Sequence, residues 1–136
     1  MRGAFISFEG IEGSGKSTCA ELLSGHLGEK GFYVVKTAEP GGTSIGMNIR
    51  NLLLSPETGA MTPLTELLLY NASRVQLIHE VIPPALKRGN IVISDRFSDS
   101  TIAYQGFGRG IDLKLIDELD LIATGRLRPD LTILLD

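Results

Sequence analysis

The stretch Gly10-Ile11-Glu12-Gly13-Ser14-Gly15-Lys16-Ser17, at residues 10–17, fits the pattern G-x-x-x-x-G-K-[ST] and is followed by Thr18. A mostly apolar run at residues 4–8 predicts a buried strand before it, and leucines at positions 22, 23 and 27 predict a helix after it. A glycine-rich loop between a strand and a helix turns its backbone N–H groups toward a phosphate at the positive end of the helix. Residues 10–18, the glycine loop, are therefore predicted to bind a nucleoside polyphosphate such as ATP.

Two side chains of the glycine loop have defined roles in this pattern. Lys16 is expected to reach the β- and γ-phosphate oxygens, and the hydroxyl of Ser17 is expected to bind Mg²⁺. A second apolar run, residues 91–94, predicts a buried strand that leads into Asp95. Asp95 has the position of the acidic residue that holds Mg²⁺, often through water. We therefore expect a Mg²⁺ site formed by Ser17 and Asp95.

Composition limits the kind of protein that the chain represents. Its 136 residues are 43% apolar, which predicts one domain, residues 1–136, with an adequate core. The formal net charge of −3 argues against a nucleic-acid-binding surface. No apolar run approaches the ~18 residues of a membrane span. The single cysteine, Cys19, excludes an internal disulfide and a cysteine metal cluster, so we expect a cytoplasmic protein.

Strand-like and helix-like patterns alternate along the chain. Strands are expected at about residues 4–9, 32–37, 91–94 and 130–136, and helices at about 16–30, 44–54, 62–88 and 112–124. The helix at 62–88 is expected to open with Thr62-Pro63 and to kink at Pro83-Pro84. A short helix capped by Ser98 or Asp99 is expected to end at residue 106. Such alternation predicts an α/β fold with a parallel sheet between helix layers, the three-layer αβα form of the P-loop NTPases and, among them, of the nucleotide kinases.

Arg96 follows Asp95 directly and narrows the class of P-loop protein. A GTPase would normally carry Asp-x-x-Gly here and Asn-Lys-x-Asp later, and neither string occurs. A motor or AAA-type ATPase more often places a second acid after the aspartate, as a base that activates water. An arginine instead favours a second phosphate held beside the first, and hence transfer to a phosphorylated acceptor. The alternative is an ordinary salt bridge between Arg96 and a helix carboxylate.

Five stretches carry a resemblance to one family. They are residues 8–18, Glu39-Pro40-Gly41-Gly42-Thr43, Asp95-Arg96-Phe97, residues 100–106, and Arg128-Pro129-Asp130-Leu131-Thr132. In their order and spacing the chain resembles the bacterial type of thymidylate kinase (dTMP kinase) over essentially its whole length. The resemblance implies ATP- and Mg²⁺-dependent phosphorylation of dTMP to dTDP, with Lys16 and Arg96 as catalytic residues.

The resemblance also implies how the nucleoside is held. Tyr70 and Arg74 lie four residues apart on one helix face, where the family carries an aromatic ring stacked on thymine and an arginine bonded to its O4. Phenylalanine is usual at the first position, so Tyr70 is a mild departure. Thr101, Tyr104 and Gln105 also share a helix face. By resemblance they complete the base and sugar pocket, with Tyr104 against a ribose 2′-hydroxyl.

Further residues complete the implied acceptor site. Glu12 resembles the carboxylate that accepts the deoxyribose 3′-hydroxyl, and Arg96 and Arg50 are expected to hold the acceptor phosphate. The loop that follows the second strand must turn sharply toward the next helix, which its two glycines permit. We predict that the Glu39–Pro40 bond is cis and that both residues line the acceptor pocket.

Two other functions stay open from the sequence. A deoxynucleoside kinase would phosphorylate a 5′-hydroxyl and would need a carboxylate base, a role for which Glu39 is the candidate. A non-catalytic module would bind nucleotides without turnover. By resemblance, a lid with a catalytic arginine, a final strand and closing helices would follow Asp136, so we expect a C-terminally incomplete kinase domain. The long apolar helix at 62–88 is suited to pack against a second copy, which makes a homodimer a candidate.

Overall fold

Four parallel strands form the central sheet of the computed structural model, which describes residues 1–136. They are β1 (Phe5–Gly10), β2 (Val34–Ala38), β3 (Ile91–Asp95) and β4 (Leu131–Leu135), in the spatial order β2-β3-β1-β4. Each strand lies where the sequence predicts one, although β2 begins two residues later than expected.

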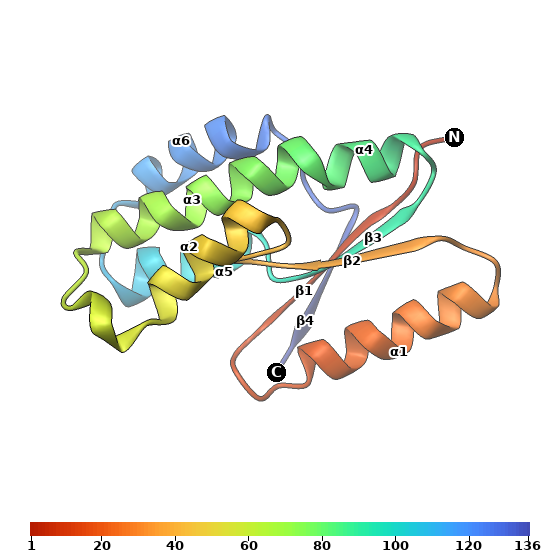
Figure 1. Cartoon of the computed structure of the whole chain (residues 1–136), viewed down its shortest axis with the longest axis horizontal. Helices are drawn as coiled ribbons and strands as arrows, with labels where there is room; N and C mark the ends of the chain where they lie inside the picture. The colour runs from red at the N-terminus through yellow and green to blue at the C-terminus, as the bar shows by residue number, and fades with distance from the viewer.

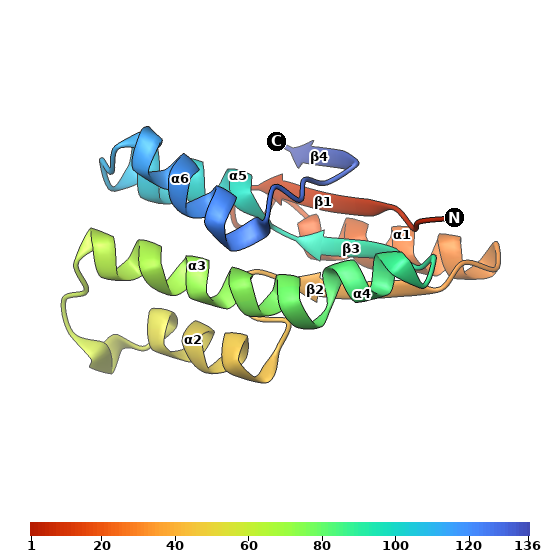
Figure 2. The same ribbon diagram turned by 90° about the horizontal axis from the view of Figure 1, so that it is seen from above.

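Helices cover both faces of the sheet and extend beyond one of its edges. α1 (Lys16–Glu29) lies on one face, and α4 (Ile82–Lys87) lies on the other, in line with α3 (Pro63–Glu80) (Figure 1). α2 (Ser44–Leu54), α5 (Ser98–Thr101) and α6 (Leu113–Thr124) gather with α3 beyond the carboxyl ends of the strands (Figure 2). A 3₁₀ turn, η1 (Pro56–Thr58), and a π-helix, η2 (Ile102–Gly108), complete the elements. The predicted three-layer αβα architecture is confirmed, and none of its helices has both the length and the apolar character needed to cross a bilayer.

Alternate side chains of β1 and β3 build a core on each face of the sheet. Phe5 and Val92 point to the face covered by α3 and α4, whereas Phe8 and Ile93 point to the face covered by α1. All four side chains are almost fully buried. The two central strands are thus apolar on both faces, as the continuous apolar runs predict for a parallel sheet.

The register of the sheet brings the ends of three strands to one edge. Phe8 of β1 and Ala38 of β2 both pair with Asp95, the last residue of β3. The segments that follow these strands therefore start side by side. Ligands of open parallel sheets bind outside the carboxyl ends of the strands. The fold thus places the glycine loop, the Glu39–Pro40 loop and Arg96 around one edge.

The helix predicted at 62–88 is in fact two helices. Thr62 caps α3 and Pro63 occupies its first turn, as predicted. The helix is then interrupted at Val81, which separates α3 from α4. Pro83 and Pro84 have no N–H, and their rings would clash with carbonyl groups four residues earlier. The break therefore comes just before the prolines, and not as a kink at them.

The short helix after β3 begins and ends differently from the prediction. Neither Ser98 nor Asp99 caps it; Phe97 takes that position and makes no side-chain capping bond. The Ser98 hydroxyl instead donates to Asp120 of α6 at 2.6 Å, so a distant partner replaces the local cap. The helix also continues past residue 106, since η2 carries it to Gly108.

Candidate functional site

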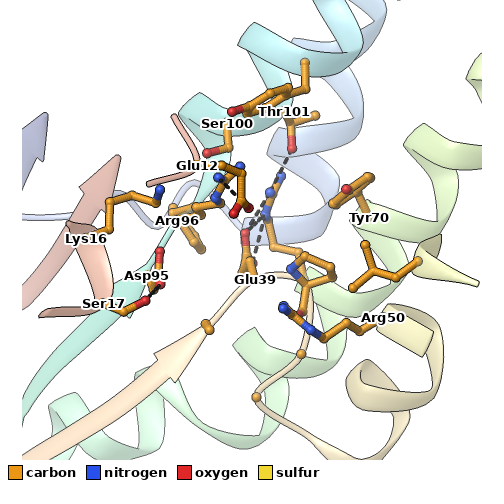
Figure 3. A pocket seen from close by; sticks show the side chains of 18 of the residues that line it. Glu12, Lys16, Ser17, Glu39, Arg50, Tyr70, Asp95, Arg96, Ser100 and Thr101 are labelled. Atoms are coloured by element: carbon orange, nitrogen blue, oxygen red, sulfur yellow. Dashed lines mark hydrogen bonds and ion pairs between the residues drawn. The ribbon is translucent and has the colours of Figure 1, made fainter. Parts of the chain in front are cut away.

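A cavity of about 790 Å³ opens at the carboxyl edge of the sheet. Figure 3 shows side chains from both loops and from α2, α3 and α5 pointing into it. The predicted site residues that line it are Glu12, Gly13, Gly15, Lys16, Ser17, Thr18, Glu39, Pro40, Arg50, Tyr70, Arg74, Asp95, Arg96, Thr101, Tyr104 and Gln105. Of the predicted residues, Gly10, Ile11 and Ser14 do not line it. The fold thus brings the predicted donor and acceptor residues into one space.

The glycine loop ends at a helix N-terminus with free donors. Gly15 is the N-cap of α1 and has a φ of 95°, a left-handed conformation that glycine adopts readily. No side chain caps α1, so its first N–H groups stay available for an anion. Lys16 is buried, and its Nζ donates to the carbonyl of Ile11 at 2.8 Å, across the loop. An ammonium group and a helix N-terminus together favour bound phosphate.

Ser17 and Asp95 lie together on one wall of the cavity, as Figure 3 shows. Ser17 Oγ donates to Asp95 Oδ2 at 2.9 Å, while Asp95 Oδ1 is buried without a hydrogen-bond partner. Such an oxygen is costly unless a cation or a donor reaches it. No group of three or more His, Cys, Asp or Glu side chains is arranged to hold a metal. Mg²⁺ keeps several waters and takes few protein ligands, so a hydroxyl beside a carboxylate with an unpartnered oxygen fits that ion.

Arg96 is held in a strained backbone conformation. Its φ is 73°, in a region that non-glycine residues seldom adopt. Its N–H donates to the carbonyl of Phe8 at 2.8 Å, and its own carbonyl accepts from the Ser94 hydroxyl at 2.7 Å. The guanidinium carbon lies 5.1 Å from the ring centroid of Tyr104, and Nη2 is 3.4 Å from Glu12 Oε1. Arg96 thus does form a salt bridge, but its partner Glu12 belongs to the glycine loop and not to a helix.

Arg74 lies at the centre of a buried charge network. Its side chain is 1% exposed, and Nη2 is 2.7 Å from Glu39 Oε1. Nη1 is 3.3 Å from Asp120 Oδ1, and Nη2 donates to Thr101 Oγ1 at 2.9 Å. The dashed lines in Figure 3 include the contacts to Glu39 and Thr101. Arg74 thus joins the loop after β2 to α3, α5 and α6. Its bond to thymine O4 stays a prediction, because most of its N–H groups already have protein partners.

Burial and charge act in opposite directions on this network. Burial raises the pKa of the Glu39 carboxyl above its ordinary value, and the Arg74 guanidinium opposes that shift. For Arg74, burial lowers the pKa, but the neighbouring carboxylates of Glu39 and Asp120 outweigh it and the pKa is raised. Arg74 therefore keeps its charge, and its removal would leave the buried Glu39 carboxylate without a cation, whereas Asp120 would keep Arg128 at 2.9 Å.

The loop after β2 has the predicted geometry. The Glu39–Pro40 bond is cis, and both residues line the cavity. Gly42 has a φ of 78°, and a Cβ at that position would lie 2.2 Å from Thr37 Oγ1. The carbonyl of Pro40 accepts from Arg50 Nη1 at 3.0 Å. The loop therefore forms one wall of the cavity and holds Arg50 there.

The remaining predicted residues line the cavity from α3, α5 and η2. Burial raises the pKa of the Tyr70 phenol on α3. Thr101 and Gln105 are buried, whereas Tyr104 is 40% exposed. Because η2 is wound as a π-helix, the expected α-helical spacing of these last three residues is wrong. They nevertheless reach the same cavity.

Sequence reasoning missed Glu9, the residue just before the glycine loop. Its side chain is buried, and burial raises its pKa to about 7, against hydrogen bonds from the Ser100 hydroxyl and the Phe97 N–H. These bonds attach the end of β1 to the segment that follows Arg96. An acidic residue at the end of an apolar strand was the available signal.

Asp120 and two apolar residues were also missed. No local pattern distinguishes Asp120, whose partner Arg74 is 46 residues away in the chain. Met47 and Leu54 of α2 line the cavity on either side of Arg50. They lie three residues before and four residues after it, a one-face helix spacing that would have found them.

Comparison with known proteins establishes the family. The sequence pattern of the family described as "Thymidylate kinase" matches residues 8–136. The chain belongs to the thymidylate kinase family. It is 58% identical to the thymidylate kinase of Geotalea daltonii and 56% identical to that of Pelobacter propionicus, over 98% of this chain in both cases. The crystal structure of thymidylate kinase from Ehrlichia chaffeensis is similar with a TM-score of 0.92 and 44% identity, over 100% of this chain and 73% of that chain.

Membership of the thymidylate kinase family confirms the resemblance drawn from the glycine loop and the Glu39–Pro40 loop. The chain spans about three fifths of the length of the curated thymidylate kinases that it matches, namely 63% of the Geotalea daltonii protein and 61% of the Pelobacter propionicus protein. The similarity covers the part of these proteins that corresponds to the sheet and the cavity described above.

Proposed function

We propose that this member of the thymidylate kinase family transfers the γ-phosphoryl group of ATP to dTMP and releases dTDP and ADP. The proposal rests on one observation: a single cavity is lined by two separate cationic groups. Lys16, with the N-terminus of α1, forms one, and Arg96 with Arg50 forms the other. Two polyanions can be held in line only where both are neutralised. The names of the relatives support dTMP as the acceptor.

The chain's own residues would position the two phosphates. Lys16 and the N–H groups of the glycine loop hold the donor, and Arg96 and Arg50 hold the 5′-phosphate of the acceptor. That phosphate is largely an anion at neutral pH, so no side chain has to remove a proton before it attacks. Mg²⁺ bound to Ser17 and Asp95 would neutralise charge on the phosphates of ATP. Positioning and charge stabilisation are therefore what this site supplies.

The nucleoside would lie on the α3 side of the cavity. The ring of Tyr70 would stack on thymine, and Arg74 would donate to its O4. Gln105 and Thr101 would complete the base pocket. Tyr104 would occupy the space of a ribose 2′-hydroxyl, and the carboxylate of Glu12 would accept the 3′-hydroxyl. Tyr104 and Glu12 are both exposed, and both contact Arg96, so they lie beside the proposed site of the acceptor phosphate.

The state of Glu39 supports a phosphate acceptor over a hydroxyl acceptor. A deoxynucleoside kinase would need a carboxylate that is free to take a proton from a 5′-hydroxyl. Glu39 was the candidate for that role, but its side chain is 4% exposed and is paired with Arg74 at 2.7 Å. Both carboxylate oxygens already accept from Arg74 Nε, so neither is free to take a proton from a 5′-hydroxyl.

Initial rates of ADP release test the proposed function. The full-length protein with ATP and Mg²⁺ is supplied with dTMP, dUMP, dCMP, AMP or thymidine, and dTMP should give the highest kcat/KM. Faster turnover of thymidine would identify a deoxynucleoside kinase. Nucleotide binding without ADP release would identify a non-catalytic module.

We also propose that the protein acts in the cytoplasm as a homodimer. Leu64, Leu68 and Val75 form an exposed apolar row along α3, each about half exposed, of the kind that a second copy buries. The single Cys19 suits a reducing compartment, where ATP and dTMP are also found. Light scattering gives the mass in solution, and a monomer would contradict the dimer. Cell fractionation tests the compartment.

A further inference from the structure

Glu66 lies beside the cavity without lining it. It is on α3, one turn before Tyr70, which does line it. Glu66 Oε1 accepts from Nε2 of Gln105 at 2.9 Å, and its Oε2 lies 3.5 Å from Nη2 of Arg109. Gln105 is 3% exposed and lines the cavity. Glu66, outside the cavity, thus fixes the position of Gln105, which lines it.

The chemistry of this pair decides which end of the Gln105 amide is free. An ionised carboxylate only accepts hydrogen bonds, and in an amide only the nitrogen donates. The amide nitrogen must therefore face Glu66, and the carbonyl oxygen, on the other arm of the planar group, points away from it. The carbonyl oxygen of Gln105 is not one of the fully buried atoms that have no hydrogen-bond partner. Gln105 itself lines the cavity. The free oxygen is thus an acceptor available to a ligand.

We propose that Glu66 is a positioning residue for base selection. It holds the Gln105 amide with its oxygen toward the base, so that the cavity accepts a base with an N–H on its pairing edge. This inference rests on the proposed function as a dTMP kinase. Thymine and uracil carry such a donor at N3, whereas N3 of cytosine is an acceptor. Rotation of the amide to suit cytosine would turn its oxygen onto the Glu66 carboxylate, so the same contact that favours thymine penalises cytosine.

Two neighbours support this role for Glu66. Arg109 Nη2 lies 3.5 Å from the second carboxylate oxygen, so both oxygens of Glu66 face hydrogen-bond donors. The negative charge of Glu66 also adds to the effect of burial that raises the pKa of the Tyr70 phenol. The carboxylate therefore lies close to the wall on which the base is proposed to stack.

The test is the ratio of kcat/KM for dTMP to kcat/KM for dCMP in Glu66→Gln. A glutamine at position 66 either donates or accepts, so Gln105 is free to rotate. The ratio should fall by about 10–100-fold, while kcat/KM for dTMP changes little. The chain offers a matched control, because Glu80 on the same helix accepts from Gln76 away from the cavity. Glu80→Gln should leave the ratio unchanged.

A double-mutant cycle separates positioning from a general effect on folding. In a Gln105→Leu background, Glu66→Gln should no longer alter the ratio, because no amide remains to be held. An unchanged ratio in Glu66→Gln alone, an equal loss for both nucleotides, or the same effect in the Gln105→Leu background would overturn the inference. Glu66→Ala, judged by the same criteria, replaces Glu66→Gln if circular dichroism finds that variant unfolded.

Different measurements test the role of Glu66 and the proposed kinase activity. If the native protein releases no ADP with dTMP, the proposed function is wrong. Dissociation constants for dTMP and dCMP, measured by calorimetry in native protein and Glu66→Gln, then replace the kinetic ratio. A preference for dTMP that is the same in both proteins would overturn the role of Glu66.

Discussion

The proposed donor side of the cavity, formed by the glycine loop, and the proposed acceptor side, formed around the Glu39–Pro40 loop and α3, are built in different ways. The donor side is one continuous segment, residues 10–18, whose binding groups are mainly backbone N–H groups and the ammonium of Lys16. The acceptor side is assembled from buried side chains of separate elements, among them Glu39, Arg74 and Asp120. The first arrangement suits any polyphosphate, whereas the second suits one nucleoside. Selectivity is therefore coupled to folding on the acceptor side only.

This difference predicts that Arg74 contributes most to stability. Replacing Arg74 by Met should lower the free energy of unfolding by about 3–5 kcal/mol, because buried Glu39 loses its only cationic partner and Asp120 keeps only Arg128. Urea denaturation measures the change, with Arg88→Met, an exposed arginine, as the control. A loss no larger than that of the control would show that the acceptor network does not support the fold.

On the donor side the expected loss is in rate. Lys16→Ala should reduce kcat by about 10²–10³-fold, since the developing charge on the γ-phosphoryl group loses its main side-chain cation. The free energy of unfolding should change little, in contrast to Arg74→Met. Lys30→Ala, beyond the last turn of α1, serves as the control. Retention of a tenth of native turnover by Lys16→Ala would refute the assigned role.

The choice of nucleotide should affect the two sides of the cavity differently, and the expected change in kcat/KM is smaller than the loss of kcat in Lys16→Ala. dUMP should be used roughly 10–200-fold less efficiently than dTMP, because only a methyl contact is lost. dCMP should be rejected more strongly, since its amino group would face the donors of Arg74. Replacing ATP by GTP should matter much less, because the donor side holds mainly phosphates. Equal kcat/KM for dCMP and dTMP would contradict the pocket assignment.

Glu9, which does not line the cavity, should affect neither side directly and should alter only the pH dependence of stability. Its pKa is about 7 in the fold against 4.5 ordinarily, so the folded state binds more protons than the unfolded state between these values. Stability from this group should therefore fall as pH rises from 4.5 through 7, on the order of 3 kcal/mol, and become level above that range. Urea denaturation of native protein and Glu9→Gln across this range measures the difference, with exposed Glu21→Gln as control. A constant difference would rule out the titration.

The donor side was predictable because its signal is local. Nine consecutive residues, with a strand before them and a helix after them, specify the loop and its charge. The cis bond at Glu39–Pro40 and the close approach at Gly42 were predictable for the same reason, since proline tolerates a cis bond and glycine allows a positive φ and a close approach wherever they occur.

The acceptor side was predictable only in part. Helix spacing and the resemblance gave Tyr70 and Arg74, but not the contact of Arg74 with Asp120, which joins α3 to α6. The prediction that Ser98 caps the short helix was wrong for a related reason. Its hydroxyl donates to Asp120 and does not bond to the backbone of its own helix. When two side chains meet only through the tertiary fold, the sequence around either residue does not indicate its partner.

The place of β4 in the sheet has a consequence for synthesis of the protein. β1 pairs with β4, and the paired residues Ile6 and Leu131 are 125 positions apart. A Cβ on Gly10 would lie 2.4 Å from the carbonyl oxygen of Leu135, so the start of the glycine loop rests against the end of β4. At about 5–20 residues per second on the ribosome, roughly 6–25 s separate the two strands. During that time the nascent chain contains the whole glycine loop but not β4, which packs against it. A bound nucleotide therefore cannot stabilise the phosphate-binding site until β4 has been synthesised.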